Sequence, residues 1–416
     1  MDIKLLKKIF FDFFKIDKID YGKCKILTIA HDTDRGYIVN GKYYSPLVDT
    51  IEDKLAENNL KCISIARIIS SIKGDLSYAN VQSPDGRFAR ALLVKRIKGF
   101  LFKNKYAYSY LEEKIWTDIL VSTGAQKVIG IMPSRELCVA CKKRGVWVAD
   151  IQHGVIAHNH PWYGKKFRSI DPIEQLPNGF LVWDEGSAEV LRNWADPSKV
   201  EVKVIGNRWL ERFKNPNPAD SIVNKSIVIF DKFISNKQNG RKVILISLSW
   251  GQVGLENGIM PETLINIIKK TSDKFLWLLR LHPNQLKGFA TNESEQFFKL
   301  YNEKLLGFAE WEIPSYSPLP SVLKYIDLHI AWNSSVVMEA AQFGVRSAAL
   351  DPRLRGEFIN DYYDFYKRNG YIDFIENDEG ILINWIHNNI SYKMDDNDFE
   401  NENIEYRKFI SFLIEN

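Results

Sequence analysis

Titratable side chains follow the predicted strands in the first half of the sequence, at the point where each apolar run ends. In chain order they are His31, Asp32, Asp34, Asp150, His153, Asp184 and Glu185. A His, Asp or Glu at a strand end can take a proton from a reacting hydroxyl if its pKa lies near neutrality. The first half of the chain is therefore predicted to carry the catalytic base, with His153, Glu185 and Asp32 as the candidates.

His153 is the preferred candidate because an unperturbed imidazole accepts a proton near pH 7. It lies in a Gln-His-Gly turn, and the loop after it runs for about 25 residues, a length that usually indicates function. Asp32, Asp34 and Glu185 are rivals whose pKa would have to be raised by burial. Two alternatives remain open: His153 only orders its loop, and Asp184 caps a helix whose first turn contains Glu185.

The predicted strand ends of the second half carry serines, one arginine and one histidine. They comprise Ser249 and Gln252 after Lys242–Leu248, Arg280 and His282 around the end of Phe275–Leu281, and Ser334, Ser335 and Glu339 after Leu328–Trp332. Ser at the start of the helix predicted at Val336–Phe343 caps it, and a helix N-terminus suits a phosphate. Glu339, one turn into that helix, can accept hydrogen bonds from a ribose. The alternative is an ordinary capped helix with a surface Glu.

The His-Pro pair at residues 282–283, followed by Ser334-Ser335 and Glu339 in a later strand–helix unit, resembles the donor half of GT-B glycosyltransferases. It is most similar to those that use CMP-sialic acid or CMP-Kdo, and to the CDP-glycerol phosphotransferases of wall polymers. The resemblance covers roughly Val243–Pro352. It implies that His282, Ser334 and Ser335 hold the donor phosphate, that Glu339 holds the ribose, and that no metal is needed.

Alternating strands and helices predict an α/β fold with parallel sheets. The resemblance implies two Rossmann-like domains facing a cleft, the GT-B plan. We expect an N-terminal acceptor-side domain at 1–213, a linker at 214–240, a nucleotide-sugar-binding domain at 241–395, and a last helix at 396–416 that crosses back to the first domain. Ile227–Phe230, inside the linker, is predicted as a strand of uncertain allegiance.

The composition is that of a globular protein, with 45% hydrophobic and 26% charged residues among 416. A net charge of +4 argues against a dedicated nucleic-acid binder. No run reaches the roughly 20 apolar residues of a membrane span, and no signal peptide is visible, so we expect a cytoplasmic protein. The single Cys138-x-x-Cys141 pair and the three histidines between 153 and 160 do not form a convincing metal set, and no cofactor is expected.

Residues 3–15 predict an amphipathic helix with lysines on one side. This helix either packs on the N-terminal domain or lies on an anionic membrane surface, which would suit a lipid-linked acceptor.

The expected function is a glycosyltransferase that moves a sugar, Kdo or another nonulosonate, from a CMP-linked donor to a lipopolysaccharide O-antigen or capsule glycan. Inversion is the simpler outcome, because the donor half offers serines rather than a carboxylate nucleophile at its first strand end; Asp231 remains the alternative. The other open functions are a CDP-alditol phosphotransferase and a non-catalytic module that binds a nucleotide or glycan.

Overall fold

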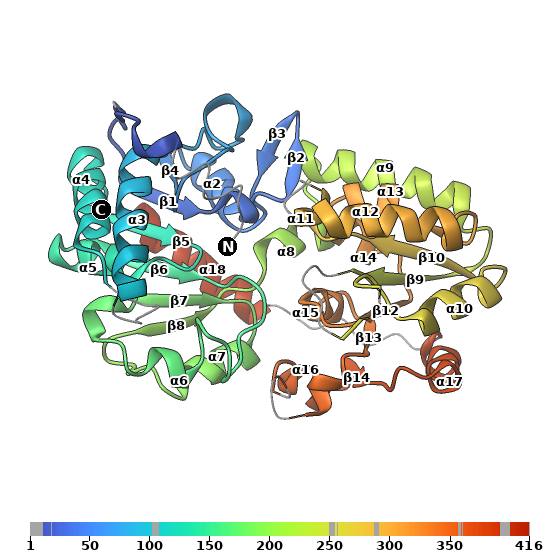
Figure 1. Ribbon diagram of the computed structural model, residues 1–416. Coiled ribbons are helices and arrows are strands. Elements are labelled where there is room, and N and C mark those ends of the chain that lie inside the picture. The colour runs from blue at the N-terminus through green and yellow to red at the C-terminus, as the bar shows by residue number, and fades with distance from the viewer. Residues whose placement is uncertain are drawn as a thin grey trace. The chain divides into compact units, whose positions relative to one another are not determined.

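The computed structural model describes residues 11–17, 19–101, 108–248, 254–255, 257–286, 291–356, 359, 361–391 and 400–415. The chain divides into two compact units. The first comprises Met1–His153, His160–Arg208 and Glu400–Asn416, and the second comprises Gly154–Asn159 and Trp209–Phe399. Each unit contains a parallel sheet flanked by helices, which confirms the predicted α/β class (Figure 1).

Within the described residues the sheet of the first unit has six parallel strands in the order β4-β1-β5-β6-β7-β8. Their bounds are β1 (Ile26–Ala30), β4 (Cys62–Ala66), β5 (Lys127–Gly130), β6 (Trp147–Ile151), β7 (Gly179–Val182) and β8 (Glu201–Val204). Every residue of β1 and β7 is buried, as expected for parallel strands covered on both faces. The chain leaves β1 toward β4 and then crosses to β5, so the sheet is doubly wound.

Helices cover both faces of this sheet because side chains alternate along each strand. Leu27 and Ile29 join the core that contains Phe88 and Trp116, whereas Ile26 belongs to the opposite core. The helices are α2 (Val48–Ala56), α3 (Asp85–Leu101), α4 (Tyr110–Thr123), α5 (Arg135–Lys143), α6 (Lys165–Arg168), α7 (Glu185–Arg192) and α18 (Glu400–Ile414); α8 (Arg208–Lys214) leads into the second unit.

The last helix, α18, completes the core of the first unit. Phe409, Ile410 and Leu413 are buried in the same cluster as Ile26 of β1. The Phe412 ring lies 4.9 Å from the Trp147 ring, centroid to centroid. Lys127 Nζ donates to the carbonyl oxygens of Phe412 at 2.6 Å and Glu415 at 2.7 Å, and a cation at this end of a helix is stabilising.

The second unit has its own parallel sheet, which among the described residues contains six strands in the order β11-β10-β9-β12-β13-β14. The strands are β9 (Lys242–Ser247), β10 (Phe275–Arg280), β11 (Ala309–Glu310), β12 (Leu328–Ala331), β13 (Arg346–Ala349) and β14 (Ile372–Phe374). The helices are α9 (Ser221–Lys237), α10 (Glu262–Thr271), α11 (Pro283–Leu286), α12 (Thr291–Leu300), α13 (Glu312–Tyr316), α14 (Leu319–Leu323), α15 (Val336–Ala341), α16 (Asp364–Arg368) and α17 (Glu379–Asn389).

The strand predicted at Ile227–Phe230 is wrong, because this run lies inside α9. Asp220 caps the helix by accepting from the backbone N–H groups of Ile222 and Val223, both at 3.2 Å. Phe230 and Ile234, four residues apart, are buried in the core of the second unit. Val228 and Ile229 point to solvent. The run is apolar at every position, so the sequence does not show that only one helical face is buried.

The sequence also missed a small antiparallel hairpin, β2 (Tyr37–Val39) and β3 (Lys42–Tyr44). Asn40 and Gly41 both have positive φ there, +50° and +76°, as a two-residue hairpin turn requires. The helix predicted at residues 3–15 falls mostly outside the described residues, which begin at residue 11. No helix in the described part of the chain is long and apolar enough to cross a membrane.

A buried imidazole ties three strands of the second sheet together. His329 of β12 is fully buried, with Nδ1 2.9 Å from Ser347 Oγ of β13 and Nε2 2.9 Å from Ser247 Oγ of β9. Burial lowers the pKa of His329 to about 3. The native protein therefore holds this imidazole neutral at pH values where an unfolded chain protonates it.

Replacing His329 should reduce the loss of unfolding free energy that occurs as pH falls. Between the pKa of about 3 in the native state and about 6.5 in the unfolded state, only the unfolded chain binds the proton, so His329 destabilises the fold increasingly as pH falls. Wild type should lose about 2 kcal/mol more unfolding free energy than His329→Gln between about pH 7 and about pH 5. Urea denaturation of both proteins at the two pH values measures this difference.

His387, exposed on α17, provides the matched control. His387→Gln should keep the wild-type pH dependence. An equal loss of stability in wild type and His329→Gln would contradict the assignment.

Candidate functional site

Residues that follow β1, β5 and β6 meet at one edge of the first sheet. Ile29 of β1 pairs with Gly130 of β5, which pairs with Asp150 of β6, so the three strands end at nearly the same level. Strand ends of open α/β sheets are where ligands bind. Across this edge His153 Nε2 lies 3.4 Å from Asp34 Oδ1.

The structure leaves His153 accessible and fixes its backbone. Its side chain is 47% exposed. Its backbone N–H donates to the hydroxyl of buried Tyr163 at 3.3 Å. His153 therefore combines a held main chain with a ring that a substrate can reach.

Asp34 is held rigidly opposite that ring. The backbone N–H of His31 donates to Asp34 Oδ2 at 2.7 Å, and the ring of His31 accepts from the backbone N–H of Thr33 at 3.2 Å. Together these contacts form a capping box around the short helix η1 (Asp32–Asp34). A carboxylate fixed in this way can orient the imidazole of His153.

The other two predicted bases are occupied elsewhere. Asp32 is buried and accepts from Ser70 Oγ at 2.6 Å and from the backbone N–H of Ser71 at 2.7 Å, so it holds the loop after β4. Glu185 lies in the first turn of α7, exposed and paired with Arg192, while Asp184 caps the helix by accepting from the backbone N–H of Ser187 at 2.7 Å. The capped-helix alternative therefore describes Glu185.

The loop after His153 is anchored by a buried carboxylate that the sequence did not assign to this task. Asp150 accepts from Trp162 Nε1 at 2.8 Å and from the backbone N–H of Met132 at 2.9 Å. Burial raises the pKa of Asp150 to about 7. The guanidinium of buried Arg168 stacks over the Trp162 ring at 4.5 Å, so Trp162 is held on two sides.

In the second sheet, three strand ends are in register. Arg280 of β10 and Ala331 of β12 both pair with Ser247 of β9, which lies between them. His282 and Asn333, each two residues further on, therefore follow strands that end at the same edge and lie two strand spacings, about 10 Å, apart. Ser249 and Gln252, predicted beside them, lie outside the described residues.

The hydrogen bonds around His282 indicate its tautomer. Its Nδ1 accepts from the backbone N–H of Asn284 at 3.1 Å, and its own backbone N–H donates to Gln285 Oε1 at 2.8 Å. In the neutral ring the proton is therefore on Nε2. His282 is half-buried and its Nε2–H can donate to a phosphate oxygen.

Ser334 and Ser335 differ in what their hydroxyls do. Ser334 Oγ accepts from the backbone N–H of Val336 at 3.3 Å. Ser335 Oγ has no hydrogen-bond partner among the described residues. The hydroxyl of Tyr363, which the sequence missed, donates to Asn333 Oδ1 at 2.7 Å and holds this turn. The helix that follows is α15, which is shorter than predicted and ends at Ala341.

Glu339 and Arg280 have distinct surroundings. Glu339 projects from α15 without a hydrogen-bond or ion-pair partner among the described residues, and burial raises the pKa of its carboxyl to about 7 against the opposing charge of Arg280. Arg280 is buried and donates from Nη1 to the carbonyl oxygens of Pro314 and, at 2.8 Å, Ser317. Glu339 can therefore accept from a ligand, whereas the Nη1 atom of Arg280 supports the neighbouring chain.

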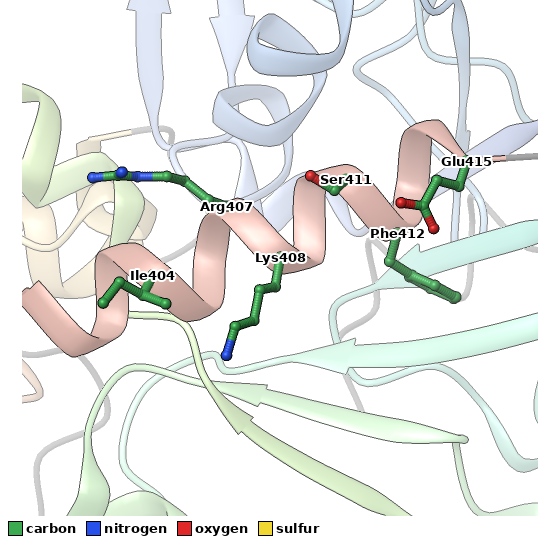
Figure 2. Close-up of a pocket in the computed structure, with 6 residues that line it drawn as sticks. All are labelled: Ile404, Arg407, Lys408, Ser411, Phe412 and Glu415. Carbon is green, nitrogen blue, oxygen red and sulfur yellow. The ribbon is translucent and has the colours of Figure 1, made fainter.

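A hollow of about 420 Å³ lies on α18, away from these residues (Figure 2). Its lining is Ile404, Arg407, Lys408, Ser411, Phe412 and Glu415. It contains none of the predicted site residues and lies along one helix rather than at strand ends. Among the described residues no three His, Cys, Asp or Glu are grouped as metal ligands.

No protein-family model and no curated protein match this sequence. Several solved structures match its fold. UDP-GlcNAc 2-epimerase from Neisseria meningitidis, bound to UDP-GlcNAc, has a TM-score of 0.55 at 15% identity and covers 94% of this chain and 100% of its own. The wall teichoic acid polymerase TagF has a TM-score of 0.54 at 14% identity, with coverage of 99% and 89%.

The UDP-GlcNAc 2-epimerase from Methanocaldococcus jannaschii has a TM-score of 0.53 at 13% identity, covering 94% of this chain and 99% of its own. At such low identity these likenesses show the fold alone. The chain therefore has a GT-B-type α/β fold similar to those of a teichoic acid polymerase and of sugar-nucleotide epimerases.

Proposed function

We propose that this protein transfers a group from a nucleotide-linked donor to an acceptor hydroxyl, with His153 as the base. The observation that carries the proposal is the accessible His153 ring held 3.4 Å from the anchored Asp34 carboxylate. The strand ends of the second unit support it, because they offer hydrogen-bond donors for phosphate and a carboxylate for ribose. Base and donor site thus fall in different units of the chain, as in a two-domain transferase.

In the proposed step, the acceptor hydroxyl loses its proton to a ring nitrogen of His153 while its oxygen attacks the donor. The imidazolium formed is stabilised by Asp34, and its hydrogen bond strengthens on protonation. The bond between the transferred group and the nucleotide phosphate breaks, and its electron pair leaves on the phosphate oxygen. His282 Nε2–H and Ser335 Oγ–H donate to that oxygen.

For the donor we propose a CMP-linked sugar, Kdo or another nonulosonate, with a surface polysaccharide such as an O-antigen or capsule as the acceptor. This assignment depends on the His282-Pro283 and Ser334-Ser335 motifs. Single displacement with inversion fits the site, because a double displacement would need a nucleophile near the donor. Ser247 is hydrogen-bonded to buried His329, and Asp231 accepts from the hydroxyl of Tyr325 on the surface.

A CDP-alditol phosphotransferase is the second candidate. The same hydrogen-bond donors would bind the phosphates of a CDP-linked substrate. TagF, whose solved structures include one soaked with CDPG, has a similar fold. Both reactions release CMP, so the product separates them. Sugar transfer adds no phosphorus to the acceptor, whereas alditol-phosphate transfer creates a new phosphodiester visible by ³¹P NMR.

The primary test is incubation with CMP-, CDP-, UDP- and GDP-linked donors. Slow release of free nucleotide from one donor, abolished in His153→Ala, supports a transferase. Tight binding without turnover, even with added glycan acceptors, would instead favour the non-catalytic nucleotide-binding module.

His153→Ala should lower kcat by about 10²–10⁴-fold while donor affinity stays unchanged, because the imidazole acts on the acceptor proton. Steady-state kinetics and calorimetry with the same donor measure the two effects. Glu185→Gln is the control and should keep kcat, since Glu185 pairs with Arg192 on the surface. If His153 only orders its loop, acceptor KM rises and saturated kcat stays within about tenfold, which would remove it as the base.

His282→Ala should weaken nucleotide binding by about 1.5–3 kcal/mol, the range for a hydrogen bond to a charged group. Calorimetry provides the affinity and a thermal melt checks the fold. His387→Ala, an exposed histidine of the same unit, should bind as wild type does. Unchanged affinity of His282→Ala for every nucleotide would argue against the donor site.

Donor affinity should rise with pH through about 7 because of Glu339. Its pKa is raised to about 7, so the carboxylate that accepts ribose hydrogen bonds is lost as pH falls below this value. Affinity should be about tenfold weaker at about pH 6 than at about pH 8. Glu339→Gln should bind weakly at both values. The measurement requires a donor whose phosphate is a diester, because such a phosphate does not titrate between about pH 6 and about pH 8.

A further inference from the structure

One face of α3 presents an apolar stripe to solvent. Leu93, Ile97 and Phe100 are 37%, 51% and 86% exposed, and their spacing of four and three residues places them on one side of the helix. Phe88 and Ala89, on another side, are buried in the core of the first unit. Large aliphatic and aromatic side chains that share a surface stripe usually mark an interaction site.

The segment before β1 extends this stripe. Arg90 lies on the same side of α3, three residues before Leu93, and its Nη1 donates to the carbonyl oxygens of Phe13 at 2.8 Å and Lys15 at 3.1 Å. This contact places the segment beside the stripe. Phe14 lies between these two residues and Ile16 follows Lys15, and the side chains of both are strongly exposed.

Exposed lysines border the stripe. Two other basic side chains of α3 are paired with carboxylates, Arg87 with Asp118 and Lys95 with Glu112 and Glu136. Lys98 is exposed next to Ile97, and Lys15 is exposed beside Phe14. The single carboxylate of residues 11–16, Asp12, is buried and paired with Lys15.

We propose that the α3 stripe, defined as Leu93, Ile97 and Phe100 with Phe14 and Ile16, docks on an anionic lipid surface. Apolar side chains bordered by lysines match the boundary between acyl chains and negative headgroups. A second copy of this chain fits less well, because a two-fold contact through the stripe would bring the lysines of both copies together. The α3 stripe contains none of the residues assigned to the proposed reaction, so the inference goes beyond that reaction.

Vesicle flotation with the full chain tests the proposal. Wild type should float with phosphatidylcholine vesicles that contain one third phosphatidylglycerol, and not with phosphatidylcholine alone. Ile97→Glu/Phe100→Glu should reduce binding by at least about tenfold, since it removes apolar insertion and adds negative charge. The matched control, Val228→Glu/Ile229→Glu on the exposed side of α9, should float as wild type does.

Two further measurements keep the proposal open to refutation. Lys98→Glu, which retains every apolar residue, should weaken binding to the anionic vesicles, and circular dichroism should show both α3 variants folded. Equal flotation of wild type and Ile97→Glu/Phe100→Glu would overturn the proposal. The proposal would also be overturned if neither protein bound vesicles and sedimentation velocity showed a wild-type dimer and a monomeric Ile97→Glu/Phe100→Glu variant.

Discussion

The strands of both sheets run parallel and hydrogen-bond to their neighbours in register, so their carboxyl ends must lie at one edge. This constraint brings His153 to Asp34 across β5, and His282 to the level of Asn333 across β9. Because both faces of each sheet are buried, polar side chains are concentrated where the strands stop. The chemistry proposed for this protein depends on that register more than on any single side chain.

Burial of polar groups sets the chemical character of each sheet. In the first unit it raises the pKa of Asp150 to about 7 and that of Glu52, which accepts from Thr28 Oγ1, to about 8. In the second unit it lowers the pKa of His329 to about 3, so this link between strands is neutral near pH 7. Structural groups therefore titrate far from their usual pH. A shifted pKa alone therefore does not identify a catalytic residue in this fold. The position of the side chain and its hydrogen-bond partners are also needed.

Much of the fold was predictable, because apolar runs such as Cys62–Ala66 and Phe275–Arg280 end in polar residues and mark strands directly. The strand predicted at Ile227–Phe230 was wrong because a short apolar run does not show whether its buried positions repeat with the period of a helix or of a strand. For the proposed site, the positions of His153, His282 and Ser335 after predicted strands made them candidates from the sequence alone. It could not rank Asp32 against Asp34, since only the folded chain shows that Asp32 binds Ser70 whereas Asp34 faces His153. Tyr363 lies about thirty residues from Asn333 and no local pattern connects them.

The position of α18 in the first unit has a consequence for synthesis on the ribosome. Phe409, Ile410 and Leu413 belong to the core formed around Ile26, yet they emerge only after the whole second unit has been translated. Until then Trp147 and its neighbours lack their cover. The second unit, which is continuous from Trp209 onward except for Gly154–Asn159, can fold while the first still waits. The core of the first unit is thus completed last, although its strands are made first.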